Sequence, residues 1–207
     1  MSESFEYLFG GYFTAKARRW INPDGSEGGI VAVEASIPDT TLMIPSEAVV
    51  WPRASIGDRV SIGEGASIRS RASIGKGASI GDGAHIGEGA RIGKGASIGY
   101  GASIGYDTNI GDGVSIGDGV SIGNGDWWLS GGPCGSRNAF WTAVWSRKQG
   151  LRWWVGCQHG ITTDQLLARI AQDHGDNEHA QDYRAVIGFV ESHPGLARAK
   201  AAAEVSP

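Results

Sequence analysis

The stretch that decides the fold is SIGEGASIRSRASIGKGASIGDGAHIGEGARIGKGASIGYGASIG, residues 61–105. An aliphatic residue occupies every sixth position, and the same register runs from Ile44 to Ile122, which makes 14 hexads. A period of six is neither the 3.6-residue period of a helix nor the two-residue period of a plain strand. Self-similarity at a fixed period is the mark of a repeat architecture, so the sequence predicts a solenoid.

Each position of the hexad has a physical role, which the hexad around Ile62 illustrates. Ile62 points into a narrow triangular prism and stacks on the Ile eighteen residues away, because three hexads make one coil. Ala66, four positions after the Ile, also fits inside, Gly65 suits a corner with positive φ, and Ser61 points outward. At a strand spacing of about 4.8 Å, about 4.7 coils make a prism on the order of 22 Å long.

This pattern resembles the bacterial hexapeptide-repeat family over Ile44 to Gly125. The resemblance implies a left-handed parallel β-helix and a homotrimer, since members of the family are usually trimeric. Many members are acyl-CoA-dependent acyltransferases, some are carbonic anhydrases, and others have no known catalysis. The fold therefore does not decide the function.

The flanks of the repeat predict two smaller parts. Residues 1–43 form an N-terminal β cap, with strand-like runs at 5–21 and 29–37 separated by the turn signal NPDGSEGG. Such a cap protects the open end of the prism at residues 44–126, where strand edges and apolar core are otherwise exposed.

The second part is a C-terminal α+β module at residues 127–195. AFWTAVW and LRWWVGC, at 139–145 and 151–157, predict a hairpin with bulky apolar residues on both faces, so we expect a partner subunit to cover one face. Thr162 and Gln165 form a capping box that opens one helix, which Gly175 ends.

A second helix is predicted over residues 177–193, and the tail at 196–207 has no evident packing partner. The expected fold is thus mainly β: a left-handed parallel β-helix with an N-terminal cap and a module of one hairpin and two helices.

Composition excludes several classes of partner. The chain has 207 residues and a net charge of −4 with both signs interspersed. It therefore lacks the basic surface that binds duplex nucleic acid or an anionic membrane.

No stretch predicts a transmembrane helix, and the first 20 residues do not resemble a signal peptide. Cys134 and Cys157 do not make a disulfide framework. We therefore expect a cytoplasmic protein with free thiols.

His85 is the candidate catalytic residue of an acyltransferase. The family's acyltransferases use a histidine to deprotonate the acceptor, and His85 is the one histidine of the prism, at the outward position that Ser usually holds. The alternative is a neutral substitution in a surface ladder that also admits Arg91 and Asn109. No loop interrupts the coils between Ser55 and Gly125, whereas such loops often shape an acceptor pocket.

Two other functions of repetitive β-helices fit poorly. A carbonic anhydrase needs three imidazoles that converge on zinc, which one prism histidine does not supply. The aligned Ser61, Ser79, Ser97 and Ser115 could mark an ice-binding face, but small hydroxyls are also the simplest solution for any exposed parallel strand.

The richest polar constellation lies outside the repeat, beginning with Ser136, Arg137 and Asn138 in the sequence GPCGSRN. A glycine-rich backbone presents N–H groups to an anion, and an arginine donates paired hydrogen bonds to a phosphate or a carboxylate. The remaining candidate ligand-binding residues are His159, His174, Asn177, His179 and Arg184.

Each of these residues also has a structural interpretation. The GSRN segment is a plausible turn, and Gly175 with Asp176 or Asn177 makes a good linker between two helices. A metal site from Cys157, His159, His174 and His179 is a further alternative, although their spacing matches no standard motif. The module also resembles those attached to hexapeptide-repeat proteins of phages and prophages, which implies no assigned activity.

The leading hypothesis is a non-enzymatic homotrimeric scaffold, of phage origin, that binds a small anionic or nucleotide-like ligand or a host protein. It requires no cofactor and no metal. The first alternative is an acyltransferase that uses acyl-CoA with His85 as the base. The second is a structural spike component that binds no small molecule.

Overall fold

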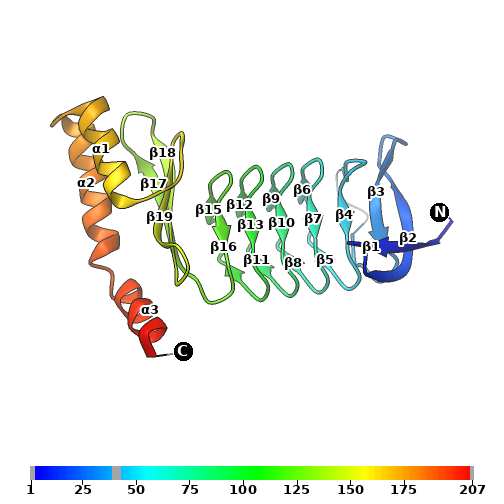
Figure 1. The fold of residues 1–207 in the computed structure, drawn as a ribbon. Helices are drawn as coiled ribbons and strands as arrows, with labels where there is room; N and C mark the ends of the chain where they lie inside the picture. The colour runs from blue at the N-terminus through cyan, green and yellow to red at the C-terminus, as the bar shows by residue number, and fades with distance from the viewer. Residues whose placement is uncertain (1–2, 39–42, 206–207) are drawn as a thin grey trace. The chain divides into compact units, whose positions relative to one another are not determined.

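The structure is a computed structural model that describes residues 3–38 and 43–205 (Figure 1). The chain divides into two compact units, Met1–Val114 and Ser115–Pro207. Among the described residues, no helix combines the length and the apolar character that crossing a membrane requires.

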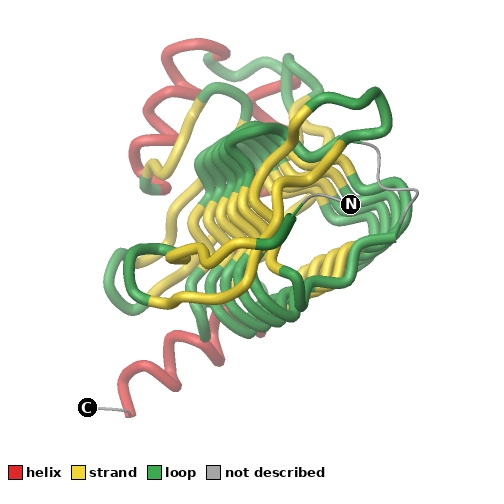
Figure 2. Tube along the Cα trace, turned by 90° about the vertical axis from the view of Figure 1, so that its right-hand side faces the viewer, coloured by secondary structure: helices red, strands yellow, loops and turns green. Residues whose placement is uncertain are grey.

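The repeat forms a parallel β-helix with one two-residue strand in each hexad, and Figure 2 looks along its stacked coils. Strands eighteen residues apart pair in parallel, so that Ile86 of β10 lies between Ile68 of β7 and Ile104 of β13. The strands of the first unit are β4 (Val49–Val50), β5 (Ser55–Ile56), β6 (Ser61–Ile62), β7 (Ser67–Ile68), β8 (Ser73–Ile74), β9 (Ser79–Ile80), β10 (His85–Ile86), β11 (Arg91–Ile92), β12 (Ser97–Ile98), β13 (Ser103–Ile104) and β14 (Asn109–Ile110). The repeat continues in the second unit with β15 (Ser115–Ile116) and β16 (Ser121–Ile122).

The interior of the prism is as the hexad predicts. Ile86 and Ala84 are both 0% exposed, whereas His85 between them is exposed. The predicted corner glycines have positive φ, for example 65° at Gly65 and 71° at Gly77. Four residues with side chains occupy the same left-handed corner position: Arg53, Arg59, Arg71 and Asp107.

The described residues of the N-terminal part contain three strands, β1 (Phe5–Phe9), β2 (Phe13–Ile21) and β3 (Glu27–Ala32). The predicted strand-like run over 5–21 is confirmed as β-structure and is divided into β1 and β2, because Gly10 and Gly11 take positive φ values of 58° and 83° and reverse the chain into a hairpin. Strand β3 then pairs in parallel with β4, so the cap joins one face of the β-helix.

The second unit contains a four-stranded antiparallel sheet in the order β17 (Trp127–Cys134), β18 (Ala139–Ser146), β19 (Gly150–Val155) and β20 (Gln158–Ile161). The predicted hairpin is confirmed as β18 and β19. The outer strands β17 and β20 were not predicted, since their sequences are rich in Gly and lack a clear alternation.

Three helices follow the sheet: α1 (Thr163–His174), α2 (Glu178–Glu191) and α3 (Pro194–Val205). The capping box of Thr162 and Gln165 is confirmed, and Gly175 caps the other end of α1. The prediction of an unpacked tail is wrong, because α3 starts at Pro194, which suits a first helical position, and Leu196 is only 1% exposed.

Both faces of the sheet are covered within this unit. Trp141 and Trp153 join a core with Leu166 and Ile170 of α1. On the other face Val144 is 3% exposed, and the repeat strand β15 contacts both β17 and β18. The cover that we expected from a partner subunit therefore comes from the chain itself.

Candidate functional site

The second unit holds a pocket of about 260 Å³ beside the turn at residues 135–138. It brings together three of the predicted residues, Ser136, Arg137 and His174. The other lining residues come from β19 and the turn after it, from α1 and from α2: Val155, Gly156, Cys157, Gln158, Leu166, Arg169, Ile170, Asp173 and Tyr183.

The turn that carries Arg137 is built from left-handed residues at both ends. Gly135 has φ of 63° and Asn138 has φ of 48°, and the Asn138 N–H donates to the Gly135 carbonyl at 3.2 Å. A Cβ atom at Gly135 would collide with the ring of Tyr183. The glycine therefore lets the turn approach α2, and Asn138 serves the turn rather than the pocket.

The charges of the pocket are predominantly positive. Arg137 and Arg169 contribute two guanidinium groups, and Asp173 contributes one carboxylate. Burial raises the pKa of Tyr183, as does Cys134, while a hydrogen bond with Ser136 and the charge of Arg137 act in the opposite direction. The phenol therefore stays protonated at neutral pH and is a hydrogen-bond donor.

The two free cysteines have different surroundings. Burial raises the pKa of Cys134 to about 11, with a contribution from Asp182, so this thiol is protonated and a poor nucleophile at neutral pH. Cys157 is exposed at the pocket. Within residues 3–38 and 43–205, no three His, Cys, Asp or Glu side chains gather into a metal-holding group.

The remaining predicted residues serve local structure. The Asn177 side chain accepts from the Ala180 N–H at 3.0 Å and caps α2. Arg184 pairs with Asp176 at 2.8 Å and donates to the Gly175 carbonyl at 3.0 Å.

The two other predicted histidines differ in their distance from the pocket. His159 Nδ1 lies 3.0 Å from the Asp118 carbonyl oxygen, which ties β20 to the last coil. The ring of His179 lies 5.9 Å from that of His174, beside the pocket but not in its lining.

Sequence reasoning missed Arg169, although a signal for it was present. Leu166, Arg169, Ile170 and Asp173 are spaced three and four residues apart, so they share one face of α1. Leu166 and Ile170 are buried, which aims this face at the sheet and places Arg169 and Asp173 at its rim.

His85 lies in the first unit on the exposed side of β10, between Ser67 and Ser103 of the neighbouring coils. Its Nδ1 is 2.8 Å from the carbonyl oxygen of Gly83. Because a carbonyl oxygen only accepts, Nδ1 is the donor in this contact, and Nε2 takes no part in it.

The match to a family model covers residues 71–106, and the model is described as bacterial transferase hexapeptide (six repeats). No curated protein sequence matches the chain.

Several solved structures are similar to this chain. The acetyltransferase domain of PglB from Neisseria gonorrhoeae is 26% identical, with a TM-score of 0.37 over 45% of this chain and 48% of that chain. The UDP-N-acetylglucosamine acyltransferase of Francisella novicida is 22% identical, with a TM-score of 0.25 over 45% and 51%. A hexapeptide transferase family protein from Anaplasma phagocytophilum is 17% identical, with a TM-score of 0.25 over 78% and 92%. The alignment spans about half the length of the first two proteins. Residues 71–106 therefore match bacterial transferase hexapeptide repeats, and in the structure these repeats form coils of a parallel β-helix.

Proposed function

We propose that this protein is a non-enzymatic binding protein whose C-terminal unit captures a small anionic ligand. The observation that carries the proposal is the presence of Arg137 and Arg169 in the lining of one pocket, beside the protonated phenol of Tyr183. Guanidinium groups bind carboxylate and phosphate through paired N–H donors. The β-helix serves as a rigid scaffold in this proposal.

The size of the pocket favours a small ligand. Its volume of about 260 Å³ lies just below the range of about 300–1,000 Å³ that holds drug-sized molecules. The carboxylate of Asp173 balances one of the two guanidinium charges. A phosphate ion or a small carboxylate fits both the volume and the remaining positive charge.

The proposed assembly is a homotrimer, as the family resemblance implies. Phe140 and Phe189 of the second unit are 58% and 55% exposed, and such exposed rings suit contacts with another copy of the chain or with a host protein. Light scattering measures the mass directly, and a monomeric mass in dilute buffer would contradict the trimer.

Replacing Arg137 by alanine is expected to weaken the binding of inorganic phosphate at least tenfold. A hydrogen bond to a charged group contributes about 1.5–3 kcal/mol, and about 1.4 kcal/mol corresponds to tenfold in affinity. Isothermal titration of the whole protein measures the change. Arg147→Ala removes the same charge from an exposed position outside the pocket and is the matched control. Equal affinity of the wild type and Arg137→Ala would remove the basis of the proposal.

A second candidate function is acyl transfer, favoured by the contact between His85 Nδ1 and the Gly83 carbonyl. In this function Nε2 of His85 takes the proton from an acceptor hydroxyl or amine, the acceptor bonds to the acyl carbon of acyl-CoA, and the C–S bond breaks so that CoA leaves as a thiol with that proton. The hexapeptide repeats around His85 belong to a class whose family model is named for transferases.

Under this second candidate, His85→Ala is expected to lower the turnover by about 10²–10⁴-fold, the usual contribution of a general base. Release of free CoA from acetyl-CoA with a panel of amine and hydroxyl acceptors measures it. Asn109→Ala, at the same outward hexad position, is the control. Wild-type protein that releases no CoA above the uncatalysed rate would rule out this function.

A further inference from the structure

The departures from the hexad consensus concentrate at one corner of the β-helix. The position after the inward aliphatic residue is Gly in most hexads, but it is Trp51 in one coil and Arg69 in the next. The corner glycine is likewise replaced by Arg53 and Arg71. Since residues eighteen apart stack in successive coils, all four side chains lie at the same corner.

Two of these arginines occupy a backbone conformation that disfavours them. Arg53 has φ of 63° and Arg71 has φ of 59°, the left-handed region in which Cβ crowds the following carbonyl oxygen. Glycine fills the equivalent position elsewhere without this penalty, for example at Gly65 and Gly77. The protein therefore keeps two arginines at one corner of successive coils, where glycine is the easier residue.

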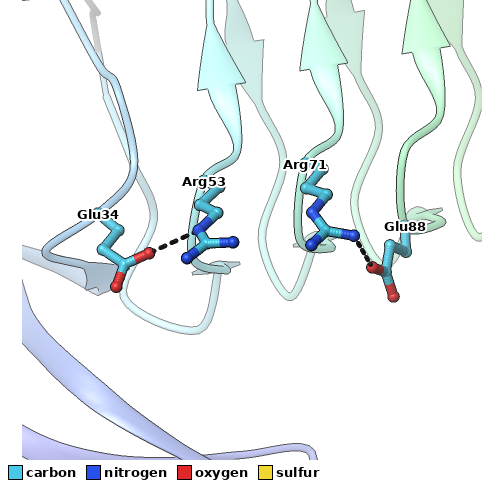
Figure 3. A network of polar contacts seen from close by, with 4 residues as sticks. All are labelled: Glu34, Arg53, Arg71 and Glu88. Atoms are coloured by element: carbon cyan, nitrogen blue, oxygen red, sulfur yellow. Dashed lines mark hydrogen bonds and ion pairs between the residues drawn. The ribbon is translucent and has the colours of Figure 1, made fainter.

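Acidic partners hold these two guanidinium groups in place (Figure 3). Arg53 Nε donates to Glu34 Oε2 at 2.9 Å, and Arg71 Nη1 lies 3.4 Å from Glu88 Oε1. Among the residues that the structure describes, the terminal nitrogens of Arg53 have no further hydrogen-bond partner. Both arginine side chains are 63% exposed, so their free donors face solvent.

The third arginine is held by aromatic residues. The guanidinium of Arg69 lies 4.1 Å from the ring centroid of Trp51, and its Nη1 donates to the Tyr12 hydroxyl at 2.8 Å. Trp51 itself is 6% exposed and packs on Phe9 in the core of the cap. Arg69 therefore fixes the ring of Tyr12 at the edge of this corner.

The three arginines line a groove of about 600 Å³ with Trp51 and Tyr12, and Glu88 contributes one carboxylate to it. Tyr12 and Phe13 contribute rings that are 74% and 45% exposed, and Arg53, Arg69 and Arg71 contribute three guanidinium groups. Exposed aromatic rings offer stacking surfaces for a planar ligand, and arginine forks bind phosphate oxygens. The volume lies inside the range of about 300–1,000 Å³ that is typical of small-molecule sites.

We propose that this groove, which we call the arginine corner (Tyr12, Phe13, Arg53, Arg69 and Arg71), binds a nucleotide-sized ligand with a phosphate group and a planar aromatic ring. Arg53 and Arg71 hold the phosphate, and the ring stacks on Tyr12 or Phe13. Glu34 and Glu88 orient the two arginines. The site belongs to Met1–Val114 and stands independently of the anion pocket in the second unit.

The test is titration of the whole protein with the four ribonucleoside 5′-monophosphates, their nucleosides and inorganic phosphate. At least one nucleotide is expected to bind the wild type more tightly than phosphate or its own nucleoside does. Its affinity is expected to fall at least tenfold in the double variant Arg53→Gly/Arg71→Gly and to persist in Arg137→Ala.

The double variant restores the hexad glycine, so it is also expected to fold. Removing the two side chains from left-handed positions stabilises the folded state, whereas the greater freedom of glycine stabilises the unfolded chain. Because these effects oppose each other, we expect a melting temperature within about 3 °C of the wild type. Arg59→Gly is the matched control, because Arg59 has φ of 57° at a different corner and should not affect binding.

Three outcomes would overturn the proposal. The first is that none of the four nucleotides binds. The second is that the nucleotides bind no more tightly than inorganic phosphate. The third is that the double variant, with an unchanged melting temperature, binds as tightly as the wild type.

Discussion

Replacing Trp153 by alanine is expected to lower the free energy of unfolding by about 3–5 kcal/mol, the usual cost of truncating a buried tryptophan. Trp153 lies in β19, is 1% exposed and is among the largest fully buried side chains of the second unit. Its ring lies 6.3 Å from that of Trp141, and its Nε1 donates to Thr163 Oγ1 at 3.0 Å. Urea unfolding followed by circular dichroism measures the loss.

A control variant separates the packing of Trp153 from its hydrogen bond. Thr163→Ala removes the acceptor and leaves the indole in place, so it should cost only about 1–2 kcal/mol. If Trp153→Ala proved no more costly than Thr163→Ala, the ring would not be the centre of the core between the sheet and α1.

Ile86→Ala is expected to lower the free energy of unfolding by about 2–5 kcal/mol. Ile86 is 0% exposed in the middle of the first unit and stacks between Ile68 and Ile104. A solenoid coil contacts only its neighbours, so no distant part of the core can close the cavity that alanine leaves. Thermal and urea unfolding of the same protein measure the change.

The neighbouring residue provides the matched control for this prediction. His85 belongs to the same two-residue strand but points outward, and His85→Ala should change stability by no more than about 0.5 kcal/mol. Similar losses for the two variants would contradict the assignment of inside and outside positions in the hexad.

The candidate anion pocket was only partly predictable. Ser136 and Arg137 stand in a glycine-rich turn and His174 at a helix end, which are local signals that a sequence displays. Arg169 and Tyr183 join them only because α1 and α2 pack beside the turn at residues 135–138. Asn177 and Arg184 follow from the same kind of local signal, and in the structure Asn177 caps α2 while Arg184 pairs with Asp176 in the connection between the helices.

The arginine corner shows a different limit. Arg53 and Arg71 are eighteen residues apart, as are Arg69 and its partner Trp51, so the repeat period alone could have aligned these two pairs. The repeat period does not predict Tyr12, which lies 57 positions from Arg69 in the chain. The hairpin turn between β1 and β2 brings it to this corner.

The sequence by itself determined the β-helix, its inward and outward positions, its left-handed corners and the ends of α1. These features repeat every six residues or depend on contacts within one helical turn, so local chemistry is sufficient to specify them. Only the tertiary structure decided the hairpin at Gly10 and Gly11, the edge strand β17, the packing of α3 through Leu196 and the cover over Val144. The last three of these depend on apolar surface that another, distant segment buries, and such a long-range contact leaves no period in the sequence.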